Sequence, residues 1–449
     1  MLTRRKASVV VRPEAAHAVL PPLPTTCVLD ILSRLTPGER LLSMQVSYAW
    51  RAAVCAPAVW RCVDLTPLAH VTERLMRAIV AKAAGHVHTL RVYVEKFSTA
   101  AETAVQLGPT LRVLEFVAAP FNFPDGLEDV RAVDEILAAA QNLVRFAVDV
   151  HVTTAAEAHA LLCNEGRYAC LKMRRLLCHH QFDVEPSRDE AAALVATLAA
   201  DLRRHPSLRE LSVEATEAAA SVDALFGAVT EAGLAGLGLE RASPLPSFAP
   251  PLARLLRGAR RLAALSVSGP YAGPGQQGLL ASEGAVAPFA AALRSNTWLT
   301  RLALTRVRLW DTVERGEAVV AALVDHASIS HLNLDDNPVA PADRPAVGAS
   351  LAQLVAANAT ALVRLGISYA WLGEEGLRPF LAVLPRNTHL RELECSELYN
   401  SDITKNFVRC SLVPAVKANT SLRRLRAGEN AGPAEKLVAA RAKTADGTS

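Results

Sequence analysis

The chain has 449 residues, of which 51% are hydrophobic and 20% are charged. This balance excludes a disordered chain, and the length fits two or three ordinary domains, or one domain followed by an elongated array. Its 48 basic and 44 acidic residues give a net charge of only +4, which argues against nucleic acid or a membrane surface as the partner. The sequence has no run of about eighteen apolar residues, so no membrane-spanning helix is expected.

Residues 1–19 are expected to form a flexible tail, and residues 23–65 predict three short helices. The first helix has apolar residues at positions i, i+3, i+4 and i+7, the stripe of an amphipathic helix. That stripe consists of Val28, Ile31, Leu32 and Leu35. The second helix is expected to begin at Thr36, with a capping box completed by Glu39. Its apolar face continues through Leu41, Leu42 and Val46. Ser47 is expected to cap the third helix.

A Leu-Pro pair, a leucine stripe and two tryptophans, in this order, resemble the F-box motif. The resemblance depends on Leu23, Pro24, Ile31, Leu32, Leu35, Leu41, Val46, Trp50 and Trp60. In that family the motif binds a Skp-type adaptor, which connects the protein to the cullin scaffold of a cullin–RING ubiquitin ligase. The resemblance implies an adaptor-facing surface made of Leu23, Pro24, Ile31, Leu32, Leu35 and Leu41.

Two roles remain open for this helical segment. Three helices in about forty residues bury too little apolar surface to be stable alone. The surplus tryptophans and leucines therefore need another surface to pack against. A structural cap would bury Trp50, Trp60 and the leucine stripe against the next domain. A docking module would instead leave part of the Leu23–Leu42 surface exposed as an apolar patch.

From Leu90 onward the phrase Leu-x-x-Leu-x-Leu returns with variations, and its alternation of apolar and variable residues predicts half-buried strands. The middle apolar residue occurs at positions 90, 114, 146, 176, 211, 237, 265, 302, 332, 365, 393 and 425. The mean spacing of about 30 residues lies just above the usual period of leucine-rich repeats. Ala/Leu-rich stretches between the copies predict helices, and such small strand–helix units must stack on their neighbours.

This pattern resembles leucine-rich repeats of the ribonuclease-inhibitor-like kind, in which helices form the convex side. The expected fold class is therefore α/β. A three-helix F-box-like module over residues 20–66 would precede a curved leucine-rich-repeat solenoid over residues 67–430, with parallel strands inside and helices outside. Residues 431–449 are expected to form a flexible C-terminal tail.

A recurring asparagine marks the junction between each predicted helix and the next strand. Copies occur at Asn296, Asn358, Asn387 and Asn419. Because asparagine tolerates the left-handed conformation that often ends a helix, we interpret these residues as helix terminators. The first interval spans two repeats, which places a missing copy near His326.

The variable residues between the strand leucines are the candidates for binding, because they point into the concave side of a solenoid. The candidates are Glu210, Arg301, His331, Asn333, Asp335, Arg364, Glu392 and Glu394. Their charges alternate in sign from repeat to repeat. Such a mixed polar surface suits a protein ligand better than a phosphate backbone.

The sequence offers little for catalysis or cofactor binding. Residues 273–278 match GxGxxG, but the expected helix starts too late and Trp298 occupies the place of the acidic residue that a dinucleotide site needs. The possible zinc ligands Cys170, Cys178, His179 and His180 have no compact spacing. Aspartate and asparagine at positions 335–337 are expected to bond to backbone where the strand turns. We therefore expect no enzyme, no metal and no cofactor.

The eight cysteines include no CxxC pair, which indicates free thiols in a reducing compartment such as the cytoplasm or nucleus. The function expected from the whole sequence is substrate recognition in a cullin–RING (SCF-type) ubiquitin ligase. The partners would be a Skp-type adaptor, a cullin scaffold and a protein substrate, without nucleic acid or membrane. The alternative is a leucine-rich-repeat interaction scaffold whose helical segment is only an N-terminal cap.

Overall fold

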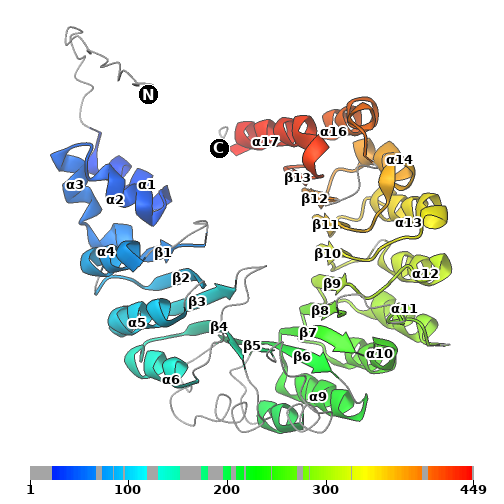
Figure 1. The fold of residues 1–449 in the computed structure, drawn as a ribbon, viewed down its shortest axis with the longest axis horizontal. Helices are drawn as coiled ribbons and strands as arrows, with labels where there is room; N and C mark the ends of the chain where they lie inside the picture. The colour runs from blue at the N-terminus through cyan, green and yellow to red at the C-terminus, as the bar shows by residue number, and fades with distance from the viewer. Residues whose placement is uncertain are drawn as a thin grey trace, which may run out of the picture.

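The computed structural model describes residues 23–446, except for 67–72, 84, 95–96, 119–129, 152–172, 180–195, 204–208, 217–218, 244, 271–276, 283, 325 and 397–402. The described chain forms an open arc with strands on the inner side and helices on the outer side (Figure 1). The strands form one thirteen-stranded sheet in which spatial order equals chain order. This confirms the expected α/β solenoid.

The strands pair in parallel with their neighbours along the whole sheet. Their bounds are β1 (Cys62–Asp64), β2 (Thr89–Val94), β3 (Val113–Ala118), β4 (Arg145–His151), β5 (Met173–His179), β6 (Glu210–Thr216), β7 (Gly236–Ser243), β8 (Ala264–Ser268), β9 (Arg301–Thr305), β10 (His331–Asn333), β11 (Arg364–Gly366), β12 (Glu392–Glu394) and β13 (Arg424–Arg426).

Three helices and a 3-10 turn come before the first strand, and the other helices cover the convex side of the sheet. The first group is α1 (Thr25–Arg34), α2 (Pro37–Ser43), α3 (Tyr48–Val54) and η1 (Pro57–Trp60). The convex helices are α4 (Glu73–Ala83), α5 (Phe97–Leu107), α6 (Val130–Ala139), α9 (Ala219–Ala232), α10 (Ala249–Gly258), α11 (Val286–Ser295), α12 (Val313–Leu323), α13 (Arg344–Ala356), α14 (Gly373–Val383), α15 (Lys405–Phe407), α16 (Val413–Ala418) and α17 (Gly432–Asp446).

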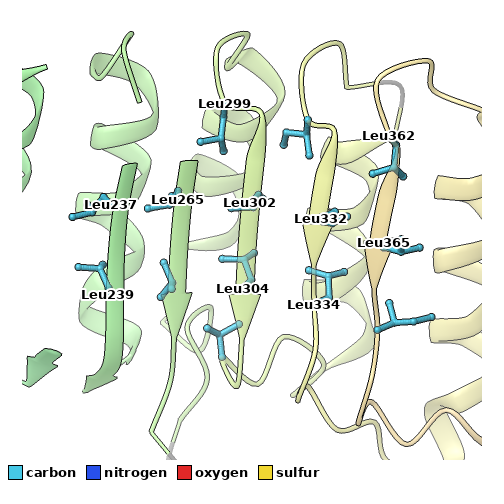
Figure 2. Packing of buried hydrophobic residues seen from close by; sticks show 14 of the residues in the cluster. Leu237, Leu239, Leu265, Leu299, Leu302, Leu304, Leu332, Leu334, Leu362 and Leu365 are labelled. Carbon is cyan, nitrogen blue, oxygen red and sulfur yellow. The ribbon is translucent and has the colours of Figure 1, made fainter. Parts of the chain in front are cut away.

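The middle leucine of each repeat stacks on the same residue of the next repeat. From β7 to β13 the register pairs Leu237, Leu265, Leu302, Leu332, Leu365, Leu393 and Leu425 in series. Figure 2 shows labelled leucines of β7 to β11 at the same level on successive strands. All seven are at most 6% exposed, and each fully buried leucine stabilises the fold by roughly 1.5–3 kcal/mol.

One step of the predicted repeat phase is wrong. Leu90, Leu114 and Phe146 stack as expected, but Phe146 lies opposite Arg174, and Leu176 lies opposite Val148. The register between β4 and β5 is therefore displaced by two residues. A displacement of two keeps each residue on its own face of the sheet, because side chains alternate with a period of two.

The junction asparagines do not adopt the left-handed conformation that we expected. Asn296, Asn387 and Asn419 have φ values of −77°, −75° and −70°, and only Asn358 has a positive φ, of 53°. The three extended asparagines instead form hydrogen bonds between repeats. Asn387 Nδ2 donates to the carbonyl of Val355 one repeat earlier at 2.9 Å, while its Oδ1 accepts from backbone N–H groups of its own repeat.

His326 replaces asparagine at the junction where the sequence predicts a missing copy. Its Nε2 lies 3.0 Å from the carbonyl oxygen of Leu293, and its Nδ1 accepts from the N–H groups of Ser328 and Ile329 at 3.4 and 3.3 Å. These partners require a neutral ring with the proton on Nε2. The imidazole thus joins two repeats in the same way as the asparagine carboxamide.

We expect His326→Asn to keep most of the stability, whereas His326→Ala should lower the free energy of unfolding by about 2–3 kcal/mol. The alanine variant leaves one carbonyl and two N–H groups without their partner in a buried place. Urea unfolding of both variants would measure the difference. Equal destabilisation by asparagine and alanine would contradict this equivalence.

The helical module is continuous with the solenoid. Strand β1 directly follows its last turn and pairs with β2, so that Cys62 lies opposite Thr89 and Asp64 opposite Arg91. Trp60, just before β1, is fully buried, and its indole Nε1 donates to the carbonyl of Val54 at 2.6 Å. The module therefore has no free linker between its last turn and the sheet.

A buried arginine holds this junction together. Arg40, on α2, is only 5% exposed. Its guanidinium donates to the carbonyls of Leu32, Ser33, Val59 and Cys62 at 2.9, 3.0, 2.7 and 3.0 Å. Two of these carbonyls belong to the last turn of α1, where a cation is favoured by the helix dipole. One side chain thus connects α1, α2, η1 and β1.

Replacing Arg40 by methionine should reduce the stability of this junction by about 2–4 kcal/mol, because four carbonyls lose a charged donor. Hydrogen exchange should show faster exchange of the α1 and β1 amides and unchanged exchange from β9 to β13. Arg34→Met is the matched control, since Arg34 is exposed and only pairs with Asp30 within the same helix. Unchanged protection of α1 in Arg40→Met would refute the role of this arginine.

The C-terminal residues are helical rather than the flexible tail that we expected from residue 431. Helix α17 covers the last repeat, and its Ala434 and Val438 are fully buried. Arg441 donates to the carbonyl of Val416 on α16 at 3.1 Å. The helix covers the apolar side that the final repeat would otherwise leave open. Within the part of the chain that the structure describes, no helix is both long and apolar enough to cross a membrane.

Candidate functional site

The six residues predicted to face an adaptor have different environments. Leu23, Pro24 and Ile31 are exposed, and Leu35 and Leu41 are half-buried. Leu32 is completely buried, in the same cluster as Val54 and Trp60. A side chain without exposed surface cannot contact a partner, so Leu32 is a core residue of the module and not part of a docking surface.

The module exposes a set of large apolar side chains, which we call the exposed apolar patch. It consists of Leu23 (53% exposed), Ile31 (37%), Leu42 (64%), Val46 (67%) and Tyr48 (85%). Among the described residues, only Val144 and Trp371 are other large hydrophobic side chains with comparable exposure. The apolar face expected to continue through Leu42 and Val46 is thus exposed at both residues, with Leu42 near the end of α2 and Val46 between α2 and α3.

On the concave side, the strand register arranges the variable residues in two rows. From β6 to β13 the first row is Glu210, Gly236, Ala264, Arg301, His331, Arg364, Glu392 and Arg424. The second row is Ser212, Gly238, Ser266, Ala303, Asn333, Gly366, Glu394 and Arg426. Seven of the eight predicted concave residues belong to these rows, and the exception is Asp335.

A hollow of about 580 Å³ opens on this side between β6 and β12. It brings together the predicted residues Glu210, Arg301, His331, Asn333, Arg364 and Glu394. Its floor has small side chains: Ala303 and four residues that the prediction did not select, Gly236, Gly238, Ala264 and Ser266. The sequence signal was present, since these residues alternate with the buried leucines of β7, β8 and β9.

The charges on the concave side are paired across neighbouring repeats. Arg364 lies 3.0 Å from Glu394 and 3.8 Å from Glu392, and Glu392 also lies 3.1 Å from Arg424. Arg301 reaches Glu210 across the intervening Gly236 and Ala264, with a longer N–O distance of 3.6 Å. The alternation of sign noticed in the sequence thus produces ion pairs between successive strands from β11 to β13, whereas the Arg301–Glu210 pair joins β9 to β6. Exposed pairs of this kind contribute little stability, typically about 0–1 kcal/mol.

All cations of this surface are arginines, and the chain has no lysine between Lys172 and Lys405. The planar guanidinium can form two parallel hydrogen bonds with one carboxylate or phosphate, which an ammonium group cannot do. The concave side is therefore suited to oriented recognition of oxyanions.

Burial and neighbouring arginines disfavour the charged form of His331. Burial lowers the pKa of this imidazole most, and the charges of Arg364 and Arg301 lower the pKa further. His331 is therefore neutral at pH 7. The positive charge at this end of the hollow comes from the two arginines on either side of it.

Asp335 lies outside the hollow and supports the turn after β10. Its Oδ1 accepts from the N–H of Ser368 at 2.6 Å, and its own N–H donates to Asn333 Oδ1 at 2.8 Å. Burial, with help from Glu394 and Asp336, raises the pKa of this carboxyl from 3.8 to about 6. The fully buried Asn337 donates to the carbonyl of Leu304 at 2.7 Å. The expected backbone bonding of this turn is confirmed.

We predict that Asp335→Asn is more stable than the unsubstituted protein at pH 7.5, by up to about 3 kcal/mol. Asparagine keeps the acceptor for Ser368 without a buried charge. Because the folded-state pKa is raised, the aspartate protein should lose stability as the pH rises from about 4 to about 6, and the variant should lack that loss. Chemical unfolding at several pH values measures the difference, which must grow over this range if the assignment is correct.

The weaker motifs gain no support from the described residues. In the part of the chain that the structure covers, no group of three or more His, Cys, Asp or Glu side chains could hold a metal ion. Of the four suggested zinc ligands, Cys170 and His180 lie outside the described residues. Most of the GxGxxG match also lies outside them, and the next helix begins only at Val286.

Comparison with known proteins identifies the helical module. Residues 20–66 match the family described as F-box-like, so the resemblance expected from the sequence is confirmed for this segment. The sequence has no significant match among curated proteins. The leucine-rich-repeat protein LegL7 from Legionella pneumophila is similar in structure, with 12% identity, a TM-score of 0.38, and coverage of 79% of this chain and 98% of LegL7. The structure of the Rad7 and Elc1 complex in yeast contains another similar chain, with 13% identity, a TM-score of 0.45, and coverage of 86% and 95%.

Proposed function

We propose that this protein is the substrate receptor of a cullin–RING ubiquitin ligase of the SCF type. The F-box-like module would dock on a Skp-type adaptor, which joins it to the cullin scaffold. The concave side of the solenoid would hold a protein substrate. In this role the chain performs no chemical step itself; it raises the effective concentration of substrate lysines near a charged conjugating enzyme.

The exposed apolar patch is the observation that carries the proposal. Five large apolar side chains are exposed to solvent within a segment of 26 residues, from Leu23 to Tyr48. A pure cap would turn such residues toward the solenoid. Because an exposed apolar surface of this kind marks an interaction site, the patch supports docking of a partner on the helical module.

The continuous junction with the solenoid supports the same role. Strand β1 belongs to the repeat sheet, and Arg40 fixes the helices against it. A receptor must hold its substrate at a defined place relative to the ligase, since effective concentration falls when the connection cannot span the two sites. The module and the concave side here belong to one connected sheet.

The alternative of a scaffold with an N-terminal cap shares some of these features. Trp60 and Leu32 are fully buried, as a cap requires. The cap does not explain the outward position of Leu42 and Val46, and this difference favours the docking role. Binding to the adaptor is therefore the property to measure.

The full-length protein should bind a purified Skp-type adaptor, and the double variant Leu42→Asp, Val46→Asp should lose at least tenfold in affinity. Both side chains are more than 60% exposed, so the charges weaken an apolar contact without entering the core. Leu32→Asp is unsuitable, because it would place a carboxylate in the core and unfold the module.

Val144→Asp is the matched control, since it changes an exposed apolar residue outside the patch. It should bind as the unsubstituted protein does, and circular dichroism should show that all variants remain folded. Absence of binding by the unsubstituted protein at tens of micromolar, where weak interfaces still register, would overturn the proposal and leave the cap as the role of residues 23–66.

A further inference from the structure

The hollow of the concave side has two chemically different ends. At the β9–β11 end, its first row is Arg301, His331 and Arg364. At the β6–β7 end it contains the carboxylates of Glu210 and Glu240. Between them lies the floor of glycine, alanine and serine. The hollow therefore has a cationic end and an acidic end with small residues between them, and the Glu210 and Ser212 side chains lie against Gly236 and Gly238.

The two arginines keep capacity for a ligand. The Arg301 side chain is 56% exposed, and its contact with Glu210 at 3.6 Å is longer than a hydrogen bond. The Arg364 side chain is 42% exposed; one terminal nitrogen pairs with Glu394 at 3.0 Å, and its Nε lies 3.8 Å from Glu392. A guanidinium has five N–H donors. Both arginines can therefore donate hydrogen bonds to an incoming oxyanion. The neutral His331 between them can add a hydrogen bond without adding charge.

The lining argues for a peptide rather than a small organic molecule. Pockets for small ligands are mostly apolar or aromatic and enclose most of the ligand surface. None of the described residues that line this hollow is Phe, Tyr or Trp, and the hollow lies on an open concave surface. The small side chains of Ala264, Ser266 and Ala303 leave room above the floor. Its volume of about 580 Å³ is that of a drug-sized ligand, which corresponds to a few residues of extended chain.

From these features we infer that the hollow binds a short extended segment of the substrate, with an anionic side chain between Arg301 and Arg364 and a basic side chain near Glu210. The Arg301 and Glu210 side chains reach within 3.6 Å of each other, and a bound segment would take the place of this contact. Neighbouring strands are about 4.8 Å apart, so the backbones of β6 or β7 and of β9 are separated by roughly 10–14 Å. An extended chain covers that span in three or four residues. The anionic group is a carboxylate or a phosphate, because a guanidinium fork recognises both.

The inference rests on the proposed function only in naming the segment a substrate. The test therefore omits the adaptor, so that failure of peptide binding and failure of adaptor docking are separate results. The probe is a random library of displayed ten-residue peptides, selected on the full-length protein and counter-selected on the Ala303→Trp variant. This substitution fills the floor of the hollow from its centre.

We expect the selected peptides to share an acidic residue three or four positions from a basic one. Synthetic copies should bind Arg301→Gln about ten- to a hundredfold more weakly. The control Arg254→Gln removes an arginine of the same exposure, 57%, from the convex helix α10 and should leave binding unchanged. Because Ala303→Trp can affect folding, the exposed Arg301 variant gives the decisive measurement, with circular dichroism as the check on folding.

Peptide substitutions distinguish the two oxyanions. Copies with glutamate, phosphoserine or glutamine at the acidic position are compared by fluorescence anisotropy. Tighter binding of glutamate or of phosphoserine than of glutamine supports the inference and names the preferred group. Failure to select peptides, equal binding of the glutamine copy, or undiminished binding by Arg301→Gln would each overturn it.

Discussion

Each repeat of this protein has one apolar surface that only its neighbours can cover. The strand leucines, such as Leu302 and Leu332, are at most a few per cent exposed only because the next repeat stacks on them in register. This constraint determines the ends of the molecule as well. The first repeat pairs with β1 of the helical module, and the last is covered by α17. Stacking also places alternate residues on the concave side, where their side chains do not pack in the core.

Polar side chains at the repeat junctions complement this apolar stack. Carbonyls at helix ends have no partner within their own helix, and Asn387 or His326 supplies one from the following repeat. Arg40 does the same for the last turn of α1 at the start of the array. The molecule thus satisfies buried backbone groups mainly by contacts between repeats, so that each repeat depends on its neighbour for hydrogen bonds as well as for burial.

The architecture could be predicted from the sequence because each repeat needs a leucine at the same position to stack on its neighbour, and this need appears as the leucine period. The period also located the junction at His326, although it could not show that an imidazole would act as a carboxamide does. The burial or exposure of individual side chains at the candidate sites was harder to predict. Leu32 and Leu42 are equally apolar, and only the packing of α1 and α2 decides that the first is buried and the second exposed. The hollow was not predicted because it depends on the small size of Gly236 and Ala264, whereas the prediction was based on the charged residues around it.

The absence of lysine between Lys172 and Lys405 has a consequence for the proposed role as a ligase receptor. Ubiquitin is transferred to primary amines, and this long stretch of the solenoid has no side-chain amine to offer. A receptor that brings an activated conjugating enzyme close to its own concave side is itself exposed to modification. With guanidinium groups in place of ammonium groups, the surface keeps its positive charge for recognition while remaining inert as an acceptor. In the proposed role, the primary amine that receives ubiquitin at the hollow would belong to the bound substrate.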